Sequence, residues 1–201
     1  KIRLDTALRM LSKPRWIGNV LAGKRKTFGN LVGRMPGMSN TASLAQWTQS
    51  QFDQALSWDD VAWVKSQWPG KLILKGILDV EDARHAVKSG ADALVVSNHG
   101  GRQLDGAPSS VSMLPRIADA VGSDIELLFD GGIRSGQDVF RALALGARSC
   151  LIGRAYTYGV GALGEKGAAK AIDLIRKELD VTMALTGLKT IKSINRDALA
   201  D

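Results

Sequence analysis

The 201-residue sequence predicts an α/β fold built from about four successive β-α units around a parallel sheet. Three observations support this prediction. From residue 71 onward, short apolar runs alternate with segments of helical length that close at glycine. The apolar runs lack polar alternation, as is typical of parallel strands covered on both faces. Glycine and polar residues follow the apolar runs, at the strand ends where such folds bind ligands.

The first two units follow each other closely. A strand over Lys71–Gly76 (KLILKG) precedes a helix over Val80–Gly90 that ends at glycine. The second strand, Ala93–Asn98, precedes a helix over Ser112–Gly122. We expect Pro115 in the first turn of that helix, where its missing N–H costs no hydrogen bond.

The last two units repeat the pattern. The strand Ile125–Phe129 leads into a helix over Ser135–Gly146, with Ser135 as a suitable N-cap and Gly146 as its end. The strand Ser149–Gly153 precedes a long helix over about Glu165–Leu185. The carboxyl ends of all four strands should meet at one edge of the sheet, where we expect the chemistry to be concentrated.

The bulk composition limits the classes of protein to consider. A chain of this length with 45% hydrophobic residues can bury one core. The single cysteine, Cys150, excludes an internal disulfide framework and fits a reducing compartment. No apolar run of about 18 residues and no signal peptide is recognisable, so we expect a cytoplasmic protein without a membrane span.

Positive charge is concentrated at the N-terminus. Residues 1–34 contain nine Lys or Arg and only one acid, Asp5, so this segment has a net charge of +8, whereas the whole chain has +7 and the rest of it is nearly neutral. Aromatic and aliphatic residues are interleaved with the basic ones, a composition suited to lying on an anionic bilayer surface. We therefore separate a basic segment, 1–50, from an α/β part, 51–201. A solvated basic loop is the alternative, and nucleic-acid binding is not expected.

Two strand ends together predict one phosphate site. They consist of Asp130, Gly131, Gly132 and Arg134 after the third strand, and of Gly153 and Arg154 after the fourth. Glycines let backbone N–H groups approach an anion, the following helix directs its N-terminus toward it, and arginine adds a bidentate contact. In an eight-stranded barrel, phosphate usually binds after the last two strands. Each motif alone could also be a glycine turn beside a solvated arginine.

The decapeptide SNHGGRQLDG, at residues 97–106, supplies a candidate base and a candidate carboxylate ligand. His99 follows the second strand beside two glycines, and histidine exchanges protons near neutral pH. Arg102 offers a planar guanidinium that matches a carboxylate. A histidine buried with satisfied hydrogen bonds is the alternative. Lys75, at the first strand end, is either solvated or able to stabilise negative charge on a cofactor ring.

Two other reactive residue types are given structural interpretations. His85 lies within the first predicted helix and is expected on the surface. Cys150 lies within an apolar strand and is expected to pack there rather than act as a nucleophile. No metal site is expected.

Four stretches carry a resemblance to a known family: LILKG, SNHGGRQLDG, DGGIRSGQDVFRALALGA and LIGRA. From about Gln51 to the C-terminus, the chain resembles the FMN-dependent 2-hydroxy acid dehydrogenases and oxidases, which include L-lactate dehydrogenase, mandelate dehydrogenase and glycolate oxidase. SNHGGRQLDG is the specific motif. The DGGIR stretch is also shared with other phosphate-binding barrels such as IMP dehydrogenase, whose catalytic cysteine loop is not evident here.

The resemblance implies the C-terminal half of a (β/α)8 TIM barrel and FMN as cofactor. It implies that His99 takes a proton from an L-2-hydroxy acid while flavin N5 receives hydride, or that an equivalent carbanion route operates. Arg102 would bind the substrate carboxylate, Lys75 would lie against the flavin N1–C2 edge, and Ser97 would lie near the ring. The ribityl chain and phosphate would be held by Asp130, Gly131, Gly132, Arg134, Gly153 and Arg154.

The resemblance also implies what this chain lacks. The family's N-terminal half supplies further flavin contacts, two tyrosines, a second arginine and the carboxylate partner of the histidine, without counterparts in residues 1–70. We therefore expect a C-terminal fragment that is inactive alone and forms homo-oligomers. Residues 1–50 match a variable segment that contacts the inner face of the cell membrane in some members. Quinone, cytochrome or oxygen would accept the electrons. The alternatives are a non-catalytic phosphate- or FMN-binding half-barrel and a basic-arm interaction module.

Overall fold

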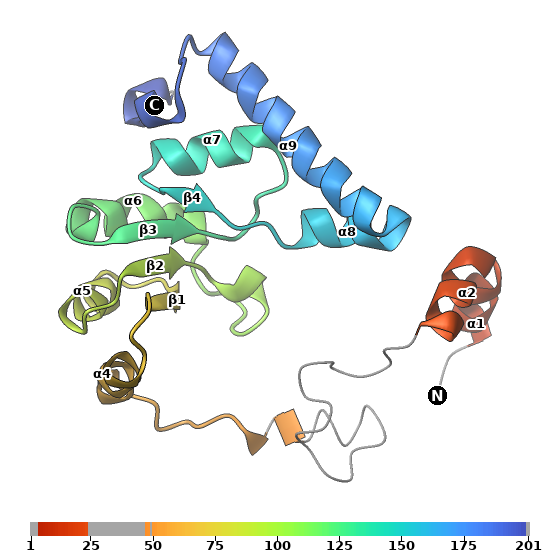
Figure 1. Cartoon of the computed structure of the whole chain (residues 1–201), viewed down its shortest axis with the longest axis horizontal. Helices are drawn as coiled ribbons and strands as arrows, with labels where there is room; N and C mark the ends of the chain where they lie inside the picture. The colour runs from red at the N-terminus through yellow and green to blue at the C-terminus, as the bar shows by residue number, and fades with distance from the viewer. Residues whose placement is uncertain (1–3, 24–46, 49, 200–201) are drawn as a thin grey trace. The chain divides into compact units, whose positions relative to one another are not determined.

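The structure, a computed structural model, describes residues 4–23, 47–48 and 50–199 (Figure 1). The chain divides into two units, Lys1–Leu56 and Ser57–Asp201. The second unit contains all ten residues that the sequence assigns to a site.

Residues 4–23 of the first unit form two short helices, α1 (Leu4–Leu11) and α2 (Pro14–Ala22), which contact each other. α2 begins at a proline, whose fixed φ suits the first helical position. The basic composition of this segment did not predict these helices. Part of the predicted membrane-contacting segment, including Lys24, Arg25, Lys26 and Phe28, lies outside the described residues. Among the described helices, none combines the length and apolar character needed to span a bilayer.

A four-stranded parallel sheet organises the second unit, in the order β1-β2-β3-β4 (Figure 1). Since consecutive parallel strands are neighbours and such connections are right-handed, the connecting helices lie on one face of the sheet. The predicted β-α units are therefore present. The strands are β1 (Ile73–Ile77), β2 (Ala93–Val96), β3 (Glu126–Phe129) and β4 (Ser149–Cys150), and the connecting helices are α5 (Val80–Lys88), α6 (Ser110–Val121) and α7 (Gly136–Ala144).

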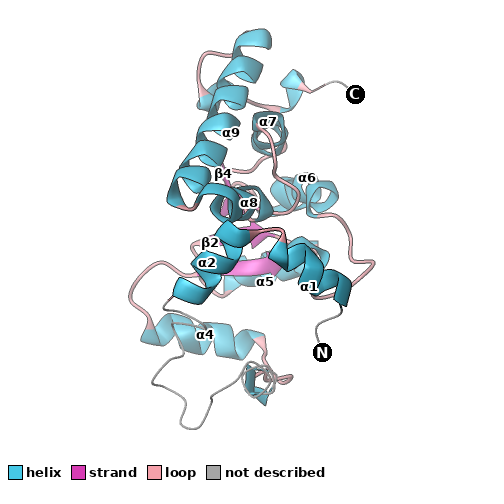
Figure 2. Cartoon of the chain, turned by 90° about the vertical axis from the view of Figure 1, so that its right-hand side faces the viewer, coloured by secondary structure: helices cyan, strands magenta, loops and turns pink. Residues whose placement is uncertain are grey.

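Three further helices complete the unit (Figures 1 and 2). α4 (Trp58–Gln67) precedes the sheet, and α8 (Arg154–Leu163) follows β4. α9 (Glu165–Leu185), predicted with these bounds, packs against α7 and α8. The sequence pattern did not predict α4 or α8. Short 3₁₀ turns occur at η1 (His99–Gly101), η2 (Ile191–Ser193) and η3 (Arg196–Ala198).

Several predicted boundaries are wrong. β1 spans Ile73–Ile77 and not Lys71–Gly76, and β2 ends at Val96 and not at Asn98. α6 begins at Ser110, because the Ser109 hydroxyl caps it by accepting the N–H of Ser112 at 3.3 Å. Pro115 therefore lies inside the helix and not in its first turn, which removes one helical hydrogen bond. β4 is also shorter than predicted, because the chain turns at Gly153 into α8.

The core lies between the sheet and helices α5, α6 and α7. Side chains such as Leu94, Phe129, Leu114 and Ile117 are fully buried there. The expectation of strands covered on both faces holds for β2, whose four residues are all buried. It is wrong for β1, which has no fully buried residue and whose Ile73 is 48% exposed, and for β3, where buried residues alternate with exposed or half-buried ones. The reason is that the connecting helices cover only one face of the sheet.

Candidate functional site

A cavity of about 690 Å³ opens at the carboxyl edge of the sheet, within the second unit. Its volume lies in the range of small-molecule and cofactor sites. Nine of the ten predicted site residues line it: Lys75, His99, Arg102, Asp130, Gly131, Gly132, Arg134, Gly153 and Arg154. The tenth, Ser97, is fully buried and hydrogen-bonded to two of the nine, Lys75 and His99. The prediction that the strand ends share one site is therefore supported by their geometry.

A polar network joins three strand ends beneath the cavity. Lys75 Nζ contacts Asp130 Oδ2 at 2.6 Å and donates to Ser97 Oγ at 2.8 Å. Side chains along a strand point alternately to the two faces of the sheet. Leu94, Val96 and their β3 neighbours fill the face covered by the helices, which leaves the other face to the polar side chains of this network. Lys75 is therefore a paired lysine, which the sequence alone left open.

Asp130 has an unused acceptor in this network. Its Oδ1 atom is buried and has no hydrogen-bond partner among the described residues. A buried carboxylate oxygen without a donor is costly, and in native structures such an atom usually receives a hydrogen bond. Asp130 therefore offers an acceptor position to a hydroxyl group in the cavity.

His99 is held in an unusual backbone conformation, with φ of +55°. Its N–H donates to Ser97 Oγ at 3.0 Å, and Asn98 Oδ1 accepts the next N–H, from Gly100, at 3.1 Å. The ring lies over Gly76, where a Cβ would come within 2.5 Å of His99 Cε1. Gly76 has a φ of +102° and interrupts the β1–β2 register. The bulge thus makes room for the imidazole, which is exposed and not a buried core histidine.

Arg102 follows η1 at the cavity wall. No described residue makes an ion pair or hydrogen bond with its exposed side chain, and the same is true of the Arg134 guanidinium. Unpaired guanidinium groups in a cavity can receive carboxylate or phosphate oxygens in bidentate geometry. Arg154 differs, since it donates to the carbonyl oxygen of Gly100 at 3.4 Å and so ties the β4 end to the β2 end.

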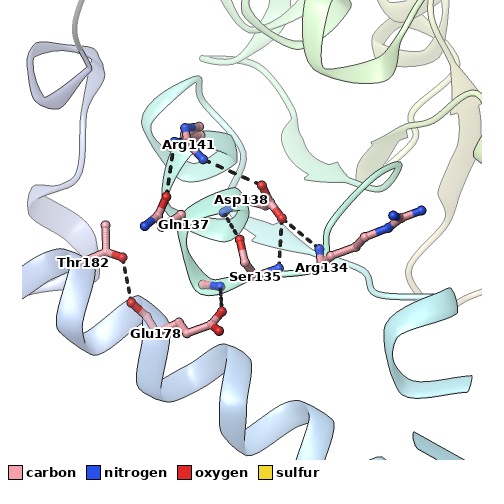
Figure 3. A network of polar contacts seen from close by, with 8 residues as sticks. Arg134, Ser135, Gln137, Asp138, Arg141, Glu178 and Thr182 are labelled. Carbon is pink, nitrogen blue, oxygen red and sulfur yellow. Dashed lines mark hydrogen bonds and ion pairs between the residues drawn. The ribbon is translucent and has the colours of Figure 1, made fainter. Parts of the chain in front are cut away.

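The N-terminus of α7 does not point a free set of N–H groups at an anion, contrary to the sequence expectation (Figure 3). Asp138 Oδ2 accepts the N–H groups of Arg134 and Ser135 at 3.0 and 2.9 Å. Glu178 Oε2, from α9, accepts the N–H of Gly136 at 2.8 Å. Two carboxylates thus occupy this helix end and would repel a phosphate there.

The N-terminus of α8 provides the alternative anion site. Its N-cap, Gly153, has no side chain to cap the first N–H groups, and both Gly153 and Arg154 line the cavity. A short helix after the last strand is a frequent phosphate-binding element in β/α barrels. Gly153 and Arg154, predicted to follow the fourth strand, are therefore the N-cap and first residue of a helix. The sequence analysis extended that strand to residue 153 and so did not predict the helix.

The structure also locates residues that sequence reasoning missed or treated as structural. Gln103 and Thr157 line the cavity, and Asn98 supports the His99 turn. Thr157 lies one turn into α8. A prediction of that helix would have placed Thr157 on the same side as Arg154, and so at the cavity. His85 is exposed, as expected, and stacks on Trp58 with ring centroids 5.5 Å apart.

Cys150 is largely removed from solvent, in keeping with its packing interpretation. Burial raises the pKa of its thiol to about 12, so the reactive thiolate is scarce at neutral pH.

Comparisons with known proteins agree on one family. The sequence matches the model of the FMN-dependent dehydrogenases over residues 1–201. It is 50% identical over 193 residues to an L-lactate dehydrogenase of Azorhizobium caulinodans, covering 96% of this chain and 51% of that protein. An L-lactate dehydrogenase of Caulobacter vibrioides is 49% identical over 190 residues, with coverages of 94% and 50%. The chain thus spans about half the length of the curated relatives it matches.

Solved structures give the same result. The monotopic membrane protein (S)-mandelate dehydrogenase superimposes with a TM-score of 0.91 at 34% identity, covering 100% of this chain and 52% of that one. Mandelate oxidase in complex with benzoyl-formic acid superimposes with a TM-score of 0.68 at 45% identity, with coverages of 70% and 42%.

Proposed function

The chain belongs to the family of FMN-dependent dehydrogenases, and on that premise we propose that its cavity serves the oxidation of a small L-2-hydroxy acid to the 2-oxo acid. The four β-α units are part of the family's TIM barrel, so the predicted fold class is confirmed. The observation that carries the proposal is the single cavity into which the strand ends converge, lined by His99, Arg102, Lys75, Arg134 and Arg154.

The residues of the cavity fit FMN, the cofactor of the family. The buried, unpartnered Oδ1 of Asp130 suits a ribityl hydroxyl donor. Arg134, Arg154 and the start of α8 suit the terminal phosphate. Gly132 and Gly153 leave open space on the cavity wall, because no atom lies within 4 Å of a Cβ built there. Bound FMN would supply the two-electron acceptor for the oxidation.

The substrate would occupy the side of the cavity formed by η1 and the residues that follow it. The free guanidinium of Arg102 would receive the carboxylate, which brings the hydroxyl-bearing carbon next to the His99 ring. His99 would accept a proton from the substrate, since imidazole is an efficient base near neutral pH. Lys75 Nζ, held by Asp130 and Ser97, would lie against the flavin ring and stabilise negative charge there.

We take lactate-like and mandelate-like acids as the substrate class, because the similar proteins carry those names. A quinone, a cytochrome or oxygen would receive the electrons from the enzyme. Under this proposal, residues 51–201 provide half of the FMN-binding barrel and residues 1–50 form a separate basic arm.

We propose further that the arm makes peripheral contact with an anionic membrane. Leu8, Leu11, Trp16 and Leu21 are exposed on α1 and α2, next to basic residues. Short amphipathic helices of this composition bind bilayer interfaces. The solved neighbour that spans this whole chain is named a monotopic membrane protein.

A substitution of His99 tests the assigned base. In the complete barrel protein that contains this chain, His99→Gln should leave FMN bound but slow its anaerobic bleaching by L-lactate or (S)-mandelate by about 10²- to 10⁴-fold, because the base is lost while the phosphate site is untouched. The rate is measured by stopped-flow absorbance. His85→Gln, at the exposed histidine on α5, is the matched control and should bleach at the wild-type rate. Equal rates for His99→Gln and wild type would show that His99 is not the base.

A further inference from the structure

We propose that Glu178, on α9, is a positioning residue for the phosphate end of the cofactor site. It fixes the loop that carries Arg134 relative to α8, which carries Arg154. The inference rests on the proposed function, since it assumes that both arginines bind the same phosphate group.

A hydrogen bond joins α9 to the start of α7 (Figure 3). Glu178 Oε2 accepts the N–H of Gly136, the first residue of α7, at 2.8 Å. Gly136 is buried, and a Cβ at this position would overlap the α9 backbone at Leu179, Glu178 and Ile175. The first turn of α7 therefore rests directly on α9, and the Glu178 carboxylate bridges the two helices.

The loop between β3 and α7 is held at both ends. At its start, the N–H of Asp130 donates to the carbonyl oxygen of Val96 at 3.1 Å, and at its end Gly136 is bound by Glu178. Between them, Asp138 accepts the N–H of Arg134 at 3.0 Å. The Arg134 side chain leads away from these carboxylates (Figure 3) and lines the cavity. Its backbone position therefore depends on contacts made by α7 and α9.

The other side of the phosphate site, the N-terminus of α8, is also held in place by α9. α8 ends at Leu163 and α9 begins at Glu165, so only Gly164 separates them. Gly159 on α8 and Gly167 on α9 meet backbone to backbone, since a Cβ on either would overlap the other's carbonyl group. Such close packing leaves little freedom between the two helices. α9 is thus the common support of the Arg134 loop and of the α8 N-terminus.

If Glu178 acts by positioning, its removal should change phosphate binding in the opposite direction from that expected if it acts only through its charge. A carboxylate near an anion site repels the anion, so removing its charge should strengthen phosphate binding if Glu178 acts only through its charge. If Glu178 acts by holding Gly136, loss of its acceptor oxygen should weaken phosphate binding even though a repelling charge is lost. Gln retains an acceptor oxygen without the charge, and Ala retains neither.

The experiment measures dissociation constants of FMN and riboflavin for the purified protein and three variants. Riboflavin lacks the phosphate, so the ratio of the two constants isolates the phosphate contribution. We expect Glu178→Ala to weaken FMN by about 5- to 10-fold, since misplacing one charge-assisted contact costs about that much. Riboflavin should change by less than about 2-fold, and Glu178→Gln should bind FMN at least as tightly as wild type. Asp173→Ala, which removes another carboxylate from the exposed side of α9, is the matched control and should leave FMN binding unweakened.

Several outcomes would overturn the inference. The first is a Glu178→Ala variant that binds FMN as tightly as wild type or more tightly. The second is an equal loss of affinity for FMN and riboflavin, which would indicate that the whole cavity, and not the phosphate site, is disturbed. A Glu178→Gln variant as weak as Glu178→Ala would also overturn it. Thermal melting of each variant checks that it folds. If Glu178→Ala does not fold, Glu178→Leu, which fills more of the space of the Glu178 side chain but has no acceptor oxygen, replaces it with the same expected result. If wild type binds FMN and riboflavin equally, the phosphate assignment itself fails, which separates failure of the proposed function from failure of this inference.

Discussion

At the scale of single residues, His99 combines backbone strain with a reactive side chain. A φ of +55° is uncommon for a residue with a Cβ and costs on the order of 1 kcal/mol or more. The strain persists because Ser97 Oγ and Asn98 hold the turn and Gly76 leaves room for the ring. Such strain is concentrated at functional sites, where the surrounding structure fixes an orientation that the isolated residue would not adopt.

Substitution of Gly76 should therefore reduce both the stability of the protein and the rate of flavin bleaching. Gly76→Ala places a methyl group on the His99 ring and strains a backbone with φ of +102°. We expect the free energy of unfolding to fall by about 1–3 kcal/mol and anaerobic flavin bleaching to slow by at least about 10-fold, because the base moves. Urea unfolding and stopped-flow absorbance measure the two effects.

Gly90→Ala is the matched control for this prediction. Gly90 has a φ of +76°, but no atom lies within 4 Å of a Cβ built there. It should lose comparable stability while bleaching stays at the wild-type rate. If Gly76→Ala also kept the wild-type rate, Gly76 would not determine the placement of His99.

At the scale of elements, α4 is attached to the sheet through one carboxylate. Asp92, just before β2, pairs with Lys65 of α4 and with Lys71, at 2.7 Å each. It also accepts the N–H of Leu72, just before β1, at 2.8 Å. These bonds lie at the amino edge of the sheet, opposite the cavity, where interactions in β/α barrels serve stability and not catalysis.

The attachment of α4 should weaken in acid. Hydrogen bonds from Lys65, then from Lys71 and from the Leu72 N–H, hold the pKa of Asp92 well below its usual range. A lowered folded-state pKa means that the carboxylate stabilises the fold fully above its unfolded pKa of about 3.9 and progressively less below it. Asp92→Asn should therefore lower the free energy of unfolding at pH 7, and its deficit against wild type should shrink as the pH falls below about 4.

Urea unfolding at several pH values, followed by tryptophan fluorescence, measures this deficit, because α4 carries Trp58 and Trp63. Asp180→Asn, at an exposed carboxyl group of α9, is the control and should show no such pH-dependent deficit. A deficit of constant size from pH 7 to pH 3 would contradict the role of the Asp92 charge.

At the scale of the whole molecule, the excess of positive charge and the cavity occupy different parts of the chain. The first 34 residues carry the excess of positive charge, whereas the cavity is built by the unit Ser57–Asp201. Within the described residues, the outer edges of β1 and β4 have no strand partner. Open parallel edges can pair with further strands, as closure of a barrel requires.

Charge removal from the arm should release the protein from anionic membranes. Replacing Arg9, Lys13 and Arg15 by Gln should weaken binding to phosphatidylcholine vesicles containing phosphatidylglycerol by up to about 100-fold, since each basic residue near the surface contributes about 1 kcal/mol. Vesicle co-sedimentation measures this, and binding should fall with added salt. Flavin bleaching should stay unchanged.

The matched control replaces Lys166, Lys170 and Lys177 of α9 by Gln, an equal change of charge at another exposed surface. It should sediment with vesicles as wild type does. An equal loss of vesicle binding in both variants would show that the net charge of the protein, and not the arm, determines binding. Equally tight binding to vesicles of phosphatidylcholine alone would contradict the electrostatic attraction.

The sequence by itself determined the β-α units, the Ser135 cap, the bounds of α9 and the strand ends that line the cavity. These features depend on local rules, because strand and helix periodicity, caps and glycine stops involve residues close together in the chain. The strand ends converge because parallel strands share a carboxyl edge.

Only the tertiary structure decided which helix end can receive a phosphate. The carboxylate that joins Asp138 at the α7 N-terminus belongs to Glu178, 42 residues beyond Gly136, and no local pattern links the two. The pairing of Lys75 with Asp130, the fit of the His99 ring over Gly76 and the exposure of one face of β1 likewise depend on contacts between distant segments. Hydrogen bonding, ion pairing and burial are set by neighbours in space, so these features were fixed only when the chain folded.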